Sequence, residues 1–123
     1  MAFQKTTTTL WSDITLATGA ADSNIICRTI PRTFEASVVA KVTFATSTAD
    51  DVTVNVYASA DNTTYSSVPI ETGLFQASDA TGLELSKAFD FKVNTYQYIR
   101  VTLSNADTTN TATVSGKLTE ALI

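Results

Sequence analysis

The feature that most constrains the fold of this chain is a long run in which apolar and polar side chains alternate. Between Thr33 and Ala45, apolar residues fall on every second position, and the residues between them are mixed. A period of two residues is typical of a β-strand with one buried face. Six such positions in succession predict a central strand of a sheet; they are Phe34, Ala36, Val38, Ala40, Val42 and Phe44.

The same alternation recurs along the rest of the chain, between segments that favour turns. It predicts a short apolar strand at 24–30, ended by Pro31, and further strands at 10–16, 52–59, 83–93, 96–103 and 111–122. Most of the segments between them contain Asn, Asp or Gly, which tolerate the backbone angles of turns. About eight short strands separated by turns predict an all-β chain, folded as an antiparallel two-sheet sandwich or jelly roll.

Three local expectations accompany this fold. The strand at 52–59 is expected to form a hairpin with a return strand at 65–68. Lys87 interrupts the apolar positions of 83–93, which indicates a bulge or an edge strand there. Residues 1–9 are polar and β-prone, which favours either an edge strand or an arm that orders against a partner, and residues 10–123 then form a single domain.

Few residues of this chain carry charge, and threonine takes their place. Charged residues make up 16% of the sequence, below the usual quarter, whereas threonine occurs 23 times. Threonine is β-branched, so it favours extended backbone, and its hydroxyl keeps the outer face of a strand hydrated. The net charge of −4 and the scattered positions of the eight basic residues argue against a nucleic-acid partner.

The residue types of common catalytic sites are either missing or placed in turns. The sequence contains no histidine, which excludes Ser-His-Asp and Cys-His pairs and most zinc sites. Asp61, Asp79 and Asp107 lie in turn-like contexts, and the oxygen-rich turns around Asp61 and Asp107 lack the spacing of a calcium loop. We therefore expect no enzymatic activity, no cofactor and no metal site. The isoleucines beside Cys27 predict a buried, unreactive thiol.

The sequence gives no indication of export or of a membrane span. Its N-terminus lacks the basic-then-apolar pattern of a secretory signal, and no apolar run reaches the roughly 18 residues that a membrane helix needs. We therefore expect synthesis in the cytoplasm and no membrane partner.

The aromatic side chains allow three interpretations. Tyr96 and Tyr98 share a strand face with Arg100, opposite the apolar face of the same strand. This face could contact another protein, since Tyr and Arg are favoured at interfaces, or the tyrosines could lie at the edge of the core with their hydroxyls in water. A sugar-binding platform is the third interpretation. Its candidate residues are Trp11, Tyr57, Tyr65, Tyr96 and Tyr98.

Two stretches carry a resemblance to a known class of proteins. One runs from Val54 to Tyr65 and reads VNVYASADNTTY, and the other runs from Tyr98 to Leu103 and reads YIRVTL. Both resemble hairpin sequences of small β-sandwich accessory proteins in the virions of tailed bacteriophages, which include head decoration proteins and tail or fibre components. Similar motifs occur in discoidin-like and other binding sandwiches.

The resemblance implies a non-enzymatic virion structural protein, a capsid decoration or stabilisation protein that binds neighbouring capsid subunits in many copies. Its implied partners are the major capsid protein or other virion proteins, and it implies a homo-oligomer, a trimer, made in the host cytoplasm. The alternative is a carbohydrate- or cell-surface-binding module of a phage tail or fibre. The candidate contact residues are Phe3, Gln4, Lys5, Leu74, Phe75, Tyr96, Tyr98 and Arg100.

Overall fold

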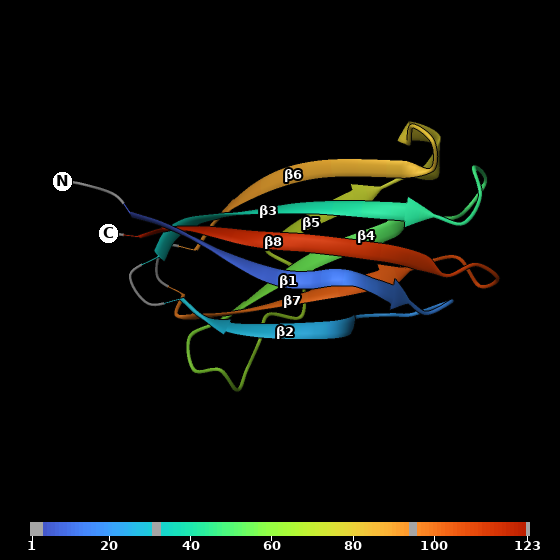
Figure 1. Ribbon diagram of the computed structural model, residues 1–123. Coiled ribbons are helices and arrows are strands. Elements are labelled where there is room, and N and C mark those ends of the chain that lie inside the picture. The colour runs from blue at the N-terminus through green and yellow to red at the C-terminus, as the bar shows by residue number, and fades with distance from the viewer. Residues whose placement is uncertain (1–3, 31–32, 94–95, 123) are drawn as a thin grey trace.

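Eight β-strands make up almost all of the regular structure of this protein (Figure 1). The computed structural model describes residues 4–30, 33–93 and 96–122. Within these residues the one helical element is a 3-10 turn at Ala77–Asp79, and no helix there is long and apolar enough to cross a membrane. The strands are β1 (Gln4–Leu16), β2 (Ser23–Thr29), β3 (Thr33–Phe44), β4 (Val52–Ser59), β5 (Glu71–Phe75), β6 (Glu84–Lys92), β7 (Tyr98–Asn105) and β8 (Ala112–Leu122).

The strands form two four-stranded antiparallel sheets that pack face to face. The first sheet has the order β1-β8-β3-β6, and the second sheet has the order β2-β7-β4-β5. Except for β4 and β5, consecutive strands lie in different sheets, so the chain crosses repeatedly between the two layers. This is the strand order of a jelly roll. The predicted all-β, two-sheet architecture is confirmed.

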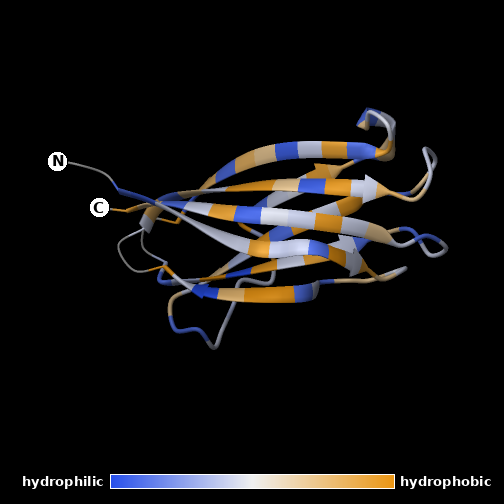
Figure 2. Cartoon of the chain, viewed as in Figure 1, coloured by the Kyte–Doolittle hydropathy of each residue, from blue (hydrophilic) through white to orange (hydrophobic). Residues whose placement is uncertain are grey.

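The core lies between the sheets and consists of the inward-facing residues that alternation predicts. In β3, five of the six predicted positions are buried and Phe34 is half-buried. Figure 2 shows the same alternation as apolar and polar bands along the strands of the first sheet. Burial of each large apolar side chain stabilises the fold by about 1.5–3 kcal/mol before the entropy cost of folding. The largest fully buried side chains include Phe44, Phe75, Leu16, Ile30, Ile99, Leu103 and Leu118.

The expected hairpin between 52–59 and 65–68 is wrong. Strand β4 pairs with β5 on one side and with β7 on the other, and residues 60–70 form a loop. Within this loop, Ser66 bonds to the end of β4 in the way a return strand would. Its amide donates to the Ala58 carbonyl, and its hydroxyl accepts from the Ala58 amide. The loop runs below β2 in Figure 1.

The charge at Lys87 is explained by an edge position, which was one of the two expectations. Strand β6 is the outer strand of the first sheet, and its register with β3 runs without a shift. The Lys87 ammonium reaches across to the other layer, where it donates to the carbonyl of Leu74 in β5 at 2.8 Å. A charge that points inward on an edge strand also disfavours pairing with another chain.

Strand β1 forms the opposite edge of the first sheet and contains two irregularities. The segment from Gln4 to Thr9 pairs with β8, so the described part of residues 1–9 is an edge strand; Phe3 lies outside the described residues. The register with β8 then shifts on either side of Trp11. These bulges bury two consecutive residues, Leu10 and Trp11, where regular alternation would bury one.

Candidate binding surface

The outer face of the second sheet carries the densest cluster of interacting aromatic and charged side chains. Cys27 in β2 lies opposite Arg100 in β7, and Arg100 lies opposite Tyr57 in β4. All three point outward because their neighbours in sequence, Val56, Ile99 and Val101 among them, point into the core. Cross-strand pairing therefore places three residues that are far apart in the sequence in one row.

The loop between β4 and β5 adds a second tyrosine to this row. The guanidinium carbon of Arg100 lies over the Tyr65 ring, 4.7 Å from its centroid, and over the Tyr57 ring, 5.1 Å from its centroid. Both distances are within the range of a cation–π interaction. We call Tyr57, Tyr65 and Arg100 the tyrosine–arginine cluster. The Tyr65 hydroxyl also donates to the side-chain oxygen of Asn62 in the same loop.

Asp22 fixes the position of Tyr57 from the loop before β2. The Tyr57 hydroxyl donates to Asp22 Oδ1 at 2.9 Å, and the Thr102 hydroxyl donates to the same oxygen at 2.7 Å. Tyr57 and Thr102 are both buried although they face outward from the sheet. Burial raises the pKa of Tyr57, and its hydrogen bond to Asp22 raises it further. Burial also raises the pKa of Tyr65, with a smaller contribution from the nearby Cys27.

Arg100 has no acidic partner in the structure described. Its Nε is buried without a hydrogen-bond acceptor, and the one ion pair among the described residues joins Arg28 to Glu120 instead. The side chain of Arg100 is half-buried, so part of it is accessible to water. The cluster therefore presents a cation whose charge no neighbouring carboxylate of the chain balances directly.

The predicted contact residues fall on separate surfaces. Tyr98 and Arg100 share the outward face of β7, whereas Tyr96 precedes the strand and is 41% exposed. Leu74, 40% exposed, lies on the edge strand β5, and Gln4 and Lys5 lie in the other sheet. Phe75 is fully buried in the core, because its position in β5 faces inward, and it cannot contact a partner.

Every member of the cluster is a candidate contact or platform residue from the sequence alone, but the sequence does not group the three together. Alternation places Arg100 on the face of Tyr96 and Tyr98, and Tyr57 and Tyr65 are only candidates for a sugar platform, because strand neighbours can be deduced from alternation and cross-strand neighbours cannot. Asp22 was missed, and no signal in the sequence connects it to Tyr57.

The prediction of a buried Cys27 is wrong. Its thiol is exposed, because alternation in β2 turns Ile26 inward and Cys27 outward. Strand β2 is also an edge strand, so its isoleucines contribute less to the core than their number suggests; Ile25 is exposed.

The aspartates of the two oxygen-rich turns, Asp61 and Asp107, cap those turns. Asp107 Oδ1 accepts from the backbone amides of Thr109 and Asn110, and its Oδ2 accepts from the amide of Asp50. Asp61 Oδ1 likewise accepts from the amides of Thr63 and Thr64. These hydrogen bonds lower the pKa of both carboxyls. Across the described residues, no group of three or more Cys, Asp or Glu residues is arranged to hold a metal ion.

Protonation of Asp107 is expected to destabilise the fold at low pH. The folded-state pKa lies below the unfolded value of about 3.9, so the contribution of this carboxylate is complete above that value and is lost as the pH falls below it. Asp107→Asn should be less stable than the wild type at neutral pH, and the difference should shrink on acidification to about pH 3. Urea unfolding at both pH values measures this, and a difference that does not change with pH would contradict it.

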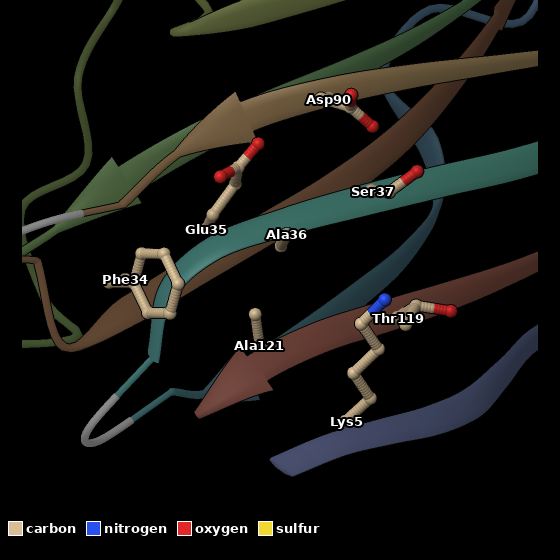
Figure 3. A pocket seen from close by; sticks show the side chains of 8 residues that line it. All are labelled: Lys5, Phe34, Glu35, Ala36, Ser37, Asp90, Thr119 and Ala121. Atoms are coloured by element: carbon tan, nitrogen blue, oxygen red, sulfur yellow. The ribbon is translucent and has the colours of Figure 1, made fainter. Parts of the chain in front are cut away.

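The outer face of the first sheet contains a hollow of about 340 Å³ at the end where β1 begins and β8 ends (Figure 3). Lys5 of β1 points over Thr119 on one side of it, and Glu35 and Asp90 lie on the other side. The remaining lining residues are apolar, apart from the small polar residue Ser37. This hollow is a weaker candidate for a binding site than the tyrosine–arginine cluster, because no hydrogen bond or ion pair described in the structure links its charged groups.

Comparison with known proteins identifies the fold. No protein-family model and no curated protein sequence matches the chain. Among solved structures, the SPBc2 prophage-derived protein YomS is 13% identical with a TM-score of 0.57, and the match covers 98% of this chain and 96% of that one. At this identity the likeness shows the fold alone.

Two further solved structures contain the same fold as part of a longer chain. A VP2 subviral particle of infectious bursal disease virus is 15% identical with a TM-score of 0.56, and the match covers 98% of this chain but 33% of the viral one. The CBM22-1 xylan-binding domain of Xyn10C from Paenibacillus barcinonensis is 8% identical with a TM-score of 0.52, over 76% of this chain and 58% of that domain. Neighbours of this fold therefore include both viral structural proteins and a carbohydrate-binding domain.

Proposed function

We propose that this protein is a non-enzymatic structural component of a virion, a capsid decoration protein that binds neighbouring capsid subunits in many copies. The observation that carries the proposal is the jelly-roll strand order, together with a likeness of fold that spans nearly the whole length of both this chain and a prophage-derived protein. The likeness to the VP2 subviral particle supports the same class. The major capsid protein or another virion protein is the proposed partner, and the virion is the proposed location.

Features of the surface support a protein partner. The outer face of the second sheet carries threonine and serine with few charges, and exposed large apolar side chains occur at Ile25, Val39, Val68 and Leu74. Such groups are readily desolvated in an interface, since they hold water less tightly than charged groups do. Many copies on a symmetric shell are compatible with a homo-oligomer, for which we propose a trimer.

The test is whether the protein is found on particles. Virions purified through a density gradient should contain the chain in a fixed ratio to the major capsid protein, measured by quantitative mass spectrometry, and particles stripped of it should rebind the recombinant protein to saturation. Detection of the protein only in the unassembled fraction, or its failure to rebind, would overturn the proposal. A sedimentation experiment on the recombinant protein gives the oligomeric state.

A carbohydrate-binding module is the second candidate, favoured by the likeness to the xylan-binding domain and by tyrosines on an outer face. The geometry of the cluster argues against it, because the Tyr57 ring is buried and Arg100 lies over both rings, where a sugar would stack. A glycan array decides between the two. Saturable binding that Tyr65→Ala abolishes would favour the carbohydrate module.

A further inference from the structure

We propose that Arg100 is a binding site for a carboxylate, supplied by an acidic side chain of a neighbouring protein subunit. The inference deepens the proposed function, on which the identity of the neighbour rests. The carboxylate site itself stands on the tyrosine–arginine cluster and can be tested without any partner.

The first argument is that the guanidinium is held in place before a ligand arrives. Arg100 lies over the rings of Tyr57 and Tyr65, and the Tyr57 ring is fixed in turn by its hydrogen bond to Asp22. Binding through a long, free arginine side chain loses rotamer entropy, whereas a side chain already packed on two rings loses less. The cluster thus has the preorganisation of a recognition site.

The second argument is that the hydrogen-bond donors of Arg100 have no acceptors in the described structure. Its Nε is buried without a partner, and no hydrogen bond of its terminal nitrogens to a described residue occurs. The terminal nitrogens are not enclosed as Nε is, so an approaching group can reach them. A planar guanidinium with two free N–H groups on one edge matches the two oxygens of a carboxylate.

The third argument is that acids of the same region are already occupied. Asp22 accepts from Tyr57 and Thr102, and Asp61 accepts from the backbone of its own loop. Neither forms an ion pair with Arg100. A ligand carboxylate must therefore come from outside the chain, and a protein subunit that presents an exposed Asp or Glu has the complementary charge.

Arg28 provides a control within the same molecule. Its Nε is also buried without a partner, but its Nη2 donates to Glu120 at 3.3 Å and to Thr8 at 3.1 Å. The carboxylate position at Arg28 is filled by the chain itself, whereas the position at Arg100 is open. A small carboxylate should therefore distinguish the two arginines.

The first experiment titrates the recombinant protein with sodium acetate and follows the arginine Nε–H resonances by NMR, with sodium chloride at equal ionic strength as the reference. We expect the Arg100 resonance to shift saturably in the millimolar range, while that of Arg28 stays within the shift caused by chloride. Arg100→Lys keeps the charge but not the planar fork. In this variant the affinity for acetate, followed by the shifts of the surrounding backbone amides, should fall at least tenfold. An Arg100 resonance that responds to acetate no more than to chloride would overturn the site.

The second experiment tests the neighbour. In the particle-rebinding assay, Arg100→Lys should bind at least tenfold more weakly than the wild type, and Arg28→Lys, with a matched charge, should bind as the wild type does. Thermal unfolding of both variants shows whether they are folded. Acetate binding with unchanged particle rebinding in Arg100→Lys would overturn the assignment to a subunit carboxylate, whereas no rebinding by the wild type would overturn the proposed function and leave the acetate result standing.

Discussion

Replacing Trp11 with alanine is expected to lower the free energy of unfolding by about 3–5 kcal/mol, the usual cost of removing a large buried aromatic side chain. Trp11 is 4% exposed, and its ring lies so close over Gly116 that a Cβ added there would come within 2.9 Å of it. Its indole Nε1–H donates to the carbonyl of Asn24 in the other sheet at 2.9 Å. Truncation would leave both a cavity at the edge of the sandwich and an unsatisfied carbonyl.

Trp11→Phe separates these two contributions. Phenylalanine restores much of the ring packing but cannot donate to Asn24, so it should recover more than half of the loss. Urea unfolding followed by far-UV circular dichroism measures all three proteins, since the replacement removes the only tryptophan of the chain and with it the fluorescence signal. A loss below about 1 kcal/mol for Trp11→Ala would show that the ring does not close the sandwich edge.

The same residue shows why some of the fold could be predicted and some could not. Alternation in β3, β4, β7 and β8 reports burial directly, and the two-sheet fold follows from it. Bulges interrupt that relation: the register shifts around Trp11 bury a residue that the pattern of Leu10, Ile14 and Leu16 places on the outer face. A bulge depends on the partner strand, so β1 alone does not reveal it.

The candidate site could be predicted only as a list of residues. Alternation places Arg100 on an outward face, but its ring contacts come from β4 and from a loop, which depend on the strand order of the second sheet. Loop residues such as Tyr65 have no periodicity from which their direction can be deduced. The expected return strand at 65–68 placed Tyr65 in a hairpin, whereas its loop position brings it over Arg100.

Charged residues on buried positions were a signal that the sequence contained. The inward positions of β8 continue through Leu118 to Glu120, and those of β2 run from Ile26 to Arg28. Two opposite charges at inward positions near strand ends are rarely left unpaired. The structure joins them across the two sheets, where Arg28 Nη2 donates to Glu120 Oε1 at 3.3 Å and the Thr33 hydroxyl donates to Glu120 Oε2 at 3.2 Å.

Removal of the cation from this pair is expected to have the second largest effect on stability. Arg28→Met keeps an apolar stem but leaves the Glu120 carboxylate, 7% exposed, without its positive partner. Breaking a fully buried pair costs about 3–5 kcal/mol, and because the Arg28 side chain is 32% exposed we expect about 2–3 kcal/mol here.

The double variant Arg28→Met/Glu120→Met tests whether the loss comes from the unpaired charge. With both charges gone, the end of the sandwich is apolar, so the double variant should regain most of the stability that Arg28→Met loses. Denaturant unfolding of the wild type, both single variants and the double variant completes the cycle at low and at high salt. The coupling should depend little on salt, because a largely buried pair is screened less than a surface pair. A double variant no more stable than Arg28→Met would mean that the loss in Arg28→Met does not come from the unpaired carboxylate of Glu120.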